Sequence, residues 1–195
     1  MPVFCTLGPA GSNHELVTRR YIDFHAIEDA RIELVLDFSE AVKMILDHRI
    51  DHIVQAAVHP ATAKTVAANK DRLFLIDAFI APSKELAVLS RVEVDRPVSL
   101  GLHPATKNYV DHRRWEELVP EISIVTVAQG LLAGKYDSGI TAVEFAEKHL
   151  DKLRVDERIG TVDDAWLVYG TERVCTGRIL AWRDSPAAAL FRKAR

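Results

Sequence analysis

The stretch Val58-His-Pro-Ala-Thr-Ala-Lys-Thr-Val66 returns 44 residues later as Leu102-His-Pro-Ala-Thr-Lys-Asn-Tyr-Val110. Each copy follows an apolar run typical of a strand and begins an amphipathic stretch typical of a helix. Proline is well tolerated in a first helical turn, and the free backbone amides of that turn, together with the helix dipole, favour an anion. The histidine before the turn and the threonine inside it add further donors. The same motif is also simply a good way to begin a helix.

Short β-branched runs alternate with amphipathic stretches on both sides of the repeat, which is the pattern of βαβ units. The alternation is interrupted at 81–84 and again at 158–164. These interruptions predict an α/β protein with two lobes, 1–81 with 160–195 and 82–159, each built on a mostly parallel sheet flanked by helices. Each lobe would contain one copy of the repeat. Two anion-favouring turns would then face one interlobe cleft, as a ligand with two carboxylates requires.

Helix starts are indicated at two places, because Ser12 with Glu15 and Thr141 with Glu144 both have the spacing of a capping box. The expected helices are 12–22, 39–47, 61–69, 106–118, 128–134 and 142–149, with a short terminal helix in the closing segment. The expected strands are 2–7, 31–36, 52–57, 74–80, 86–90, 99–102, 123–127, 138–141 and 165–169.

The composition of the 195 residues excludes several classes of protein. Twenty-five Lys and Arg stand against 28 Asp and Glu, a formal net charge of −3, so no chain-wide basic field exists to hold a nucleic acid. Cys5 and Cys175 lie far apart without a metal-ligand spacing, which predicts reduced thiols and neither a zinc site nor a disulfide. No basic start followed by an apolar run is present, so we expect a cytoplasmic protein without a membrane partner.

The first loop, Thr6-Leu-Gly-Pro-Ala-Gly-Ser12, is a glycine-rich turn between a strand and a helix. The backbone amides of this turn point toward any ligand that lies above the start of that helix. The loop lacks the GxxxxGK and GxGxxG spacings that wrap a di- or triphosphate. We therefore expect neither a nucleotide nor another cofactor, and no metal.

Four segments in order resemble the catalytic domain of prephenate dehydratases. Residues 6–13 resemble the family's LGPxGT opening, and 38–42 with 49–54 resemble its "sfeeaveaV…g.aDyaVvP" segment. Residues 102–108 resemble its SHPQALAQ segment, and 134–147 its alanine-rich stretch. The resemblance covers nearly the whole chain. It implies a two-lobed fold similar to the type II periplasmic binding proteins, and a homodimer, since family members are commonly dimeric.

The chain departs from that family at several points. The ENS tripeptide after the third strand is replaced by a run that begins at Gln55, and the Thr-Arg-Phe triplet by Asp164, Ala165 and Trp166. The family's Thr and Arg assist loss of the substrate hydroxyl and anchor the substrate, and an ACT domain usually follows them. The non-aromatising prephenate decarboxylases of bacilysin-type pathways lack both features, and this sequence resembles that branch more closely. Dehydratase-like proteins of tropone-sulfur antibiotic pathways would share the same losses.

The resemblance implies a cofactor-independent lyase that acts on prephenate or a similar cyclohexadiene dicarboxylate. A second interpretation is a small-anion binding or sensing protein that kept the fold after losing catalysis. Histidines titrate near neutral pH, so they are the candidate acids, and Asp164 could orient one of them. Lys107 is the expected anchor for a carboxylate. The candidate catalytic residues are His103, His59, His14 and Asp164. The candidate binding residues are Thr6, Gly11, Ser12, Asn13, Thr62, Thr106, Lys107, Asn108, Thr141 and Trp166.

Overall fold

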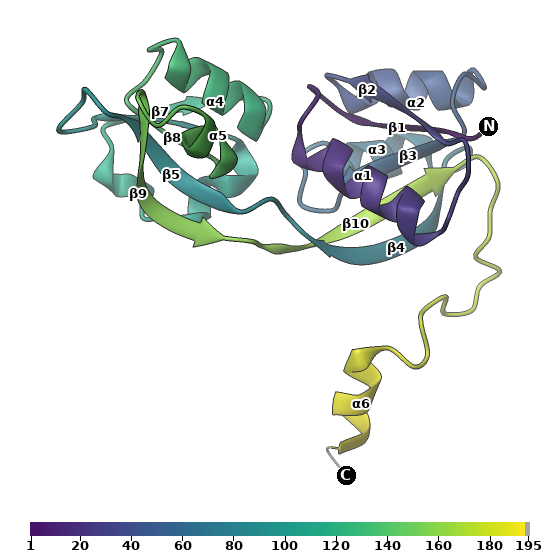
Figure 1. Cartoon of the computed structure of the whole chain (residues 1–195). Helices are drawn as coiled ribbons and strands as arrows, with labels where there is room; N and C mark the ends of the chain where they lie inside the picture. Colours follow the sequence, from purple (N-terminus) through teal and green to yellow (C-terminus); the bar gives the residue numbers. More distant parts are fainter. Residues whose placement is uncertain (194–195) are drawn as a thin grey trace.

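The computed structural model describes residues 1–193 and contains two five-stranded sheets, each with helices packed against it (Figure 1). The first sheet has the strand order β2-β1-β3-β10-β4 and the second has the order β7-β6-β8-β5-β9. The strands are β1 Val3–Leu7, β2 Arg31–Val35, β3 His52–Ala56, β4 Phe74–Pro82, β5 Leu86–Arg91, β6 Ser99–Leu102, β7 Glu117–Pro120, β8 Ser138–Ala142, β9 Leu153–Gly160 and β10 Asp163–Gly170. The helices are α1 Asn13–Phe24, α2 Phe38–Leu46, α3 Thr62–Asn69, α4 Ile124–Leu132, α5 Glu144–Lys148 and α6 Pro186–Lys193, with 3-10 helices η1 Pro104–Tyr109 and η2 His112–Arg114.

Two crossovers join the lobes, where β4 continues into β5 and β9 continues into β10 (Figure 1). The crossovers are bonded to each other, because Ser83 N–H donates to the Val162 carbonyl at 2.8 Å and Val162 N–H donates to Ser83 Oγ at 2.9 Å. The strands that enter and leave the crossovers are antiparallel to their neighbours. Each sheet is therefore mixed, and only the β1-β2, β1-β3, β6-β7 and β6-β8 pairs are parallel.

Each lobe has its own apolar core. In the first lobe, Trp166 of β10 is fully buried among Phe4, Val17 and Val54. In the second lobe, Tyr136 fills the space above Gly101, and a methyl group at that glycine would overlap the tyrosine ring. Each lobe therefore packs around its own set of buried residues.

Several local expectations differ from the structure. Ser12 does cap α1, accepting from Glu15 N–H at 3.1 Å, while Glu15 Oε2 accepts from Gly11 N–H at 2.7 Å. Thr141 caps no helix, because it lies in β8 and donates to the Ile124 carbonyl. The expected long helix at 106–118 is instead two 3-10 helices and β7, and the expected strand at 123–127 is the start of α4. At α4, the Ser123 cap outweighs the β-branched run that favoured a strand.

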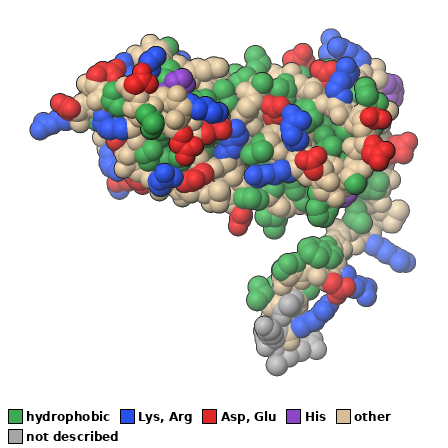
Figure 2. Space-filling view, in the orientation of Figure 1, with side chains coloured by type: hydrophobic (Ala, Val, Ile, Leu, Met, Phe, Trp, Pro, Cys, Tyr) green, Lys and Arg blue, Asp and Glu red, His purple; other side chains and the backbone are tan. Residues whose placement is uncertain are grey.

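The segment after β10 leaves the body as an extended arm that ends in α6 (Figure 1). Its large apolar side chains are exposed, among them Ile179, Trp182 and Phe191, and Figure 2 shows hydrophobic groups along it. Within residues 1–193, no helix has the length and apolar character needed to span a bilayer.

Candidate functional site

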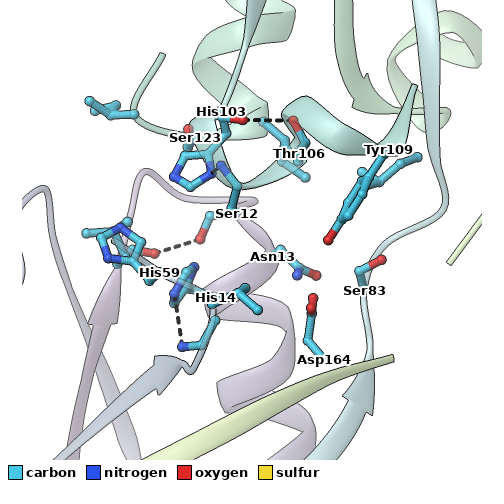
Figure 3. Close-up of a pocket in the computed structure, with 17 residues that line it drawn as sticks. Ser12, Asn13, His14, His59, Ser83, His103, Thr106, Tyr109, Ser123 and Asp164 are labelled. Carbon is cyan, nitrogen blue, oxygen red and sulfur yellow. Dashed lines mark hydrogen bonds between the residues drawn. The ribbon is translucent and has the colours of Figure 1, made fainter. Parts of the chain in front are cut away.

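A cavity of about 70 Å³ lies between the lobes and is lined by side chains from both of them (Figure 3). In the part of the chain that the structure describes, its lining holds three histidines and Asp164 but no Lys or Arg. Pockets for small organic ligands usually measure about 300–1,000 Å³. The space between the lobes in this structure is therefore smaller than a typical pocket of that kind.

The two copies of the repeat meet at this cavity with the same local geometry. His59 Nδ1 accepts a hydrogen bond from Ala61 N–H at 3.1 Å, and His103 Nδ1 accepts one from Ala105 N–H at 3.2 Å. Thr106 Oγ1 donates to the His103 carbonyl, whereas Thr62 Oγ1 donates to the Ala56 carbonyl. The amides expected to receive an anion are thus already bonded to the histidine rings.

These bonds fix which nitrogen of each ring carries the proton. A neutral imidazole that accepts at Nδ1 must carry its proton on Nε2. His59 and His103 therefore each offer one Nε2–H donor, one from each lobe, with ring centroids 5.7 Å apart. The site would receive an anion on imidazole donors rather than on helix amides.

His14 completes the cluster from the first turn of α1. Its ring lies 5.8 Å from His59, stands edge-on to Trp166 at 5.0 Å, and accepts at Nε2 from Ala56 N–H at 3.4 Å. Burial, together with the neighbouring imidazoles, lowers the pKa of His14 to about 3 and that of His103 to about 4. Burial also lowers the pKa of His59, partly offset by Asp37. The cluster is neutral at pH 7, and a bound carboxylate would favour its protonation.

The opposite end of the pocket is formed by Asn13, Ser83, Tyr109 and Asp164, which point toward one another (Figure 3). Burial raises the pKa of Asp164, and Asp163 raises it further. Burial and then Asp164 raise the pKa of Tyr109. Asp164 lies apart from the histidines in this view, so it does not orient one of them.

The remaining predicted residues divide into lining and supporting groups. Ser12 and Thr106 line the pocket and are buried. Thr6 is buried and donates to the Val54 carbonyl, and Trp166 is core, packed against His14. Gly11 has a φ of 82°, a backbone conformation that suits glycine at this turn.

Lys107 and Asn108 lie on the exposed side of η1 and do not line the pocket. Thr62 and Thr141 likewise bond to backbone carbonyls and are absent from the lining. Lys107 lies in a 3-10 helix instead of the expected α-helix. The two have different numbers of residues per turn, so the side chains of a first turn lie on different faces.

Sequence reasoning missed three polar residues that line the pocket. Ser83 belongs to a crossover, Tyr109 ends η1 and Ser123 caps α4. The interruption at 81–84 marked the first of these, and Tyr109 lies within the second copy of the repeat, but nothing in the sequence near Ser123 indicated the cleft.

The described residues contain no group of three or more His, Cys, Asp or Glu that could hold a metal ion. Cys5 is a buried free thiol, and Cys175 is a partly exposed free thiol on the arm. Neither belongs to the pocket lining.

No protein-family model matches this chain, and no curated protein sequence matches it. Several solved structures are similar to this chain. Prephenate dehydratase from Arthrobacter aurescens, in complex with L-Phe, is 18% identical over 96% of this chain and 69% of its own, with a TM-score of 0.63. An ABC transporter from Parabacteroides distasonis is 17% identical over 100% of this chain and 70% of its own, with a TM-score of 0.55.

The arginine-bound, truncated ArgBP from T. maritima is 13% identical over 88% of each chain, with a TM-score of 0.50. Identities this low establish a shared fold and no more. The chain therefore has the two-lobed α/β fold that this prephenate dehydratase shares with periplasmic-type binding proteins.

Proposed function

We propose that this chain binds prephenate or a similar cyclohexadiene dicarboxylate between its lobes and acts on it as a cofactor-independent lyase. The observation that carries the proposal is the convergence of both histidine turns on one cavity, with His59 and His103 5.7 Å apart. A ligand with two carboxylates at one end would be received by Nε2–H donors from both lobes. The likeness of the fold to a prephenate dehydratase supports this substrate class.

The reaction that fits the residues best is decarboxylation without aromatisation. The ring carboxylate leaves as carbon dioxide, and the electron pair of the broken carbon–carbon bond moves into the diene. A ring carbon at the far end of the shifted double bonds then takes a proton, and the hydroxyl stays. His59 or His103 is suited to supply that proton as the imidazolium that a bound carboxylate favours, because loss of the proton then leaves the neutral ring.

Dehydration is less well supported by the residues. It needs a donor that protonates the departing hydroxyl, and Asp164 and Trp166 stand where the family's Thr-Arg-Phe triplet would lie.

Purified protein mixed with prephenate and followed by ultraviolet absorbance tests the proposal. A conjugated, non-aromatic product is expected. Formation of phenylpyruvate would show that the reaction is dehydration and not decarboxylation. Unchanged prephenate without saturable binding would overturn the assignment of this substrate class.

The second candidate is a binding protein without catalysis. It is favoured by the absence of Lys and Arg from the described pocket lining and by the arginine-bound relative in fold. Saturable binding of prephenate that leaves it chemically unchanged would support this function.

A further inference from the structure

Asp164 is a buried acidic group to which the decarboxylation proposed above assigns no role. Asp164 is only 8% exposed and lines the pocket. Its side chain forms no hydrogen bond with any other residue in 1–193. Little of this residue is in contact with solvent, so its carboxyl group is available to a ligand in the pocket and to no described protein group. A ligand that offers a hydrogen-bond donor at this point would satisfy it.

The neighbours of Asp164 determine what kind of donor fits. Ser83 is already engaged, since its hydroxyl donates to the Lys84 carbonyl at 2.8 Å and accepts from Val162 N–H at 2.9 Å. Asn13 Oδ1 accepts from Lys84 N–H at 3.0 Å, which leaves only its Nδ2–H groups for a ligand. The Tyr109 hydroxyl faces the same space and forms no hydrogen bond within the described chain.

This end of the pocket therefore presents an acceptor, the Asp164 carboxyl, a donor, the Asn13 amide, and the Tyr109 hydroxyl, which can donate or accept. A ligand hydroxyl donates once and accepts through its oxygen, so it can pair with both the carboxyl and the amide. An ammonium group accepts nothing, so it would leave the Asn13 amide unpaired. The set favours a hydroxyl.

We propose that Asp164, Tyr109 and Asn13 form a hydroxyl-binding subsite that selects hydroxy acids whose carboxylate and hydroxyl lie at opposite ends. The inference rests on the proposed function for the carboxylate end and adds the specificity of the other end. A cyclohexadienol has this arrangement when one ring carbon carries a carboxylate and a side chain that ends in a second carboxylate, and the hydroxyl lies across the ring. Asn13 belongs to α1, Asp164 to β10 and Tyr109 to η1 of the second lobe, so a bound hydroxyl would also bridge the lobes.

The test uses two stable acids that differ only in a hydroxyl, 4-hydroxyphenylpyruvate and phenylpyruvate, titrated into the full-length protein by calorimetry beside prephenate. We expect the hydroxylated acid to bind at least tenfold more tightly. Asp164→Ala should abolish that preference, and Tyr109→Phe should reduce it severalfold. Asp163→Ala is the matched control, because this adjacent aspartate is exposed and should leave the preference unchanged.

The outcomes separate this inference from the proposed function. Equal binding of the two acids by the unaltered protein overturns the subsite and leaves the carboxylate site standing. Tighter binding of 4-(aminomethyl)phenylpyruvate, which carries its ammonium group at the far end, than of 4-hydroxyphenylpyruvate would show that the subsite selects an ammonium group and would overturn the assignment of a hydroxyl. Failure of prephenate and both acids to bind overturns both proposals. Circular dichroism of each variant confirms that a lost preference is not a lost fold.

Discussion

At the scale of single residues, the site depends on two histidines whose tautomers are set by their own turns. Ala61 and Ala105 amides occupy Nδ1 of His59 and His103, so the Nε2–H groups remain for a ligand. Under the proposed function, we expect the rings, rather than the nearby lysine, to meet the anion. Lys107 is exposed on η1 and outside the pocket lining.

Removing either ring should therefore weaken ligand binding more than removing the lysine. His59→Ala and His103→Ala are expected to lower the affinity for prephenate about tenfold each, roughly 1.4 kcal/mol, measured by calorimetry. Lys107→Ala should change it less than twofold. A tenfold loss in the lysine variant would restore Lys107 as the anchor.

The buried histidines also predict how stability depends on pH. The pKa of His14 is about 3 in the folded protein and about 6.5 when unfolded, so between these values only the unfolded chain takes up the proton. The free energy of unfolding should therefore fall with decreasing pH, by about 1.4 kcal/mol per pH unit from this residue between pH 6 and 4.

Urea unfolding at several pH values measures this slope. His14→Asn should lower the slope of the free energy of unfolding against pH by about 1.4 kcal/mol per pH unit. His25→Asn, at an exposed position, should leave this slope unchanged. Equal slopes for the unaltered protein and His14→Asn would contradict the lowered pKa.

At the scale of elements, the second lobe relies on a close approach between β6 and the ring of Tyr136. The tyrosine hydroxyl donates to the Val127 carbonyl of α4 at 2.7 Å, which holds the ring above Gly101 and joins the helix to the sheet. Only a glycine leaves room for the ring at this point of β6.

Gly101→Ala should destabilise the protein by about 1–3 kcal/mol, because the new methyl group overlaps a buried ring that has no free space to enter. Chemical denaturation measures the loss. In a Tyr136→Ala background the same substitution should cost much less stability. If the two losses simply add, the cost of Gly101→Ala does not come from overlap with the tyrosine ring.

At the scale of the whole molecule, the two lobes and the arm differ in how they are held. The lobes share two bonded crossovers and the interlobe pocket, whereas the arm beyond residue 174 forms its hydrogen bonds within itself among the described residues. The arm leaves large apolar side chains in water and adds little burial to either core.

Deleting residues 176–195 should therefore leave the melting temperature of the body within about 2 °C of the full chain, as measured by calorimetry. Prephenate binding should also be unchanged, because the described arm contributes nothing to the lining of the interlobe pocket. A drop of 10 °C or more would show that the arm is packed on the body in solution.

The sequence by itself determined the features that depend on neighbouring residues. Alternating runs predicted an α/β protein, the Ser12 cap began α1, and the repeat predicted two equivalent turns that the structure brings to one cavity. Each of these follows from local periodicity, from a cap or from a proline, which act over a few residues.

Tertiary structure alone decided which of the predicted groups meet. It placed His14 beside His59, turned Lys107 away from the pocket and brought Tyr109 to Asp164, across large separations in sequence. It also converted 106–118 into 3-10 turns and a strand, because pairing of β7 with β6 outweighs helix propensity. Such contacts depend on how the lobes pack and cross, and no local pattern encodes that.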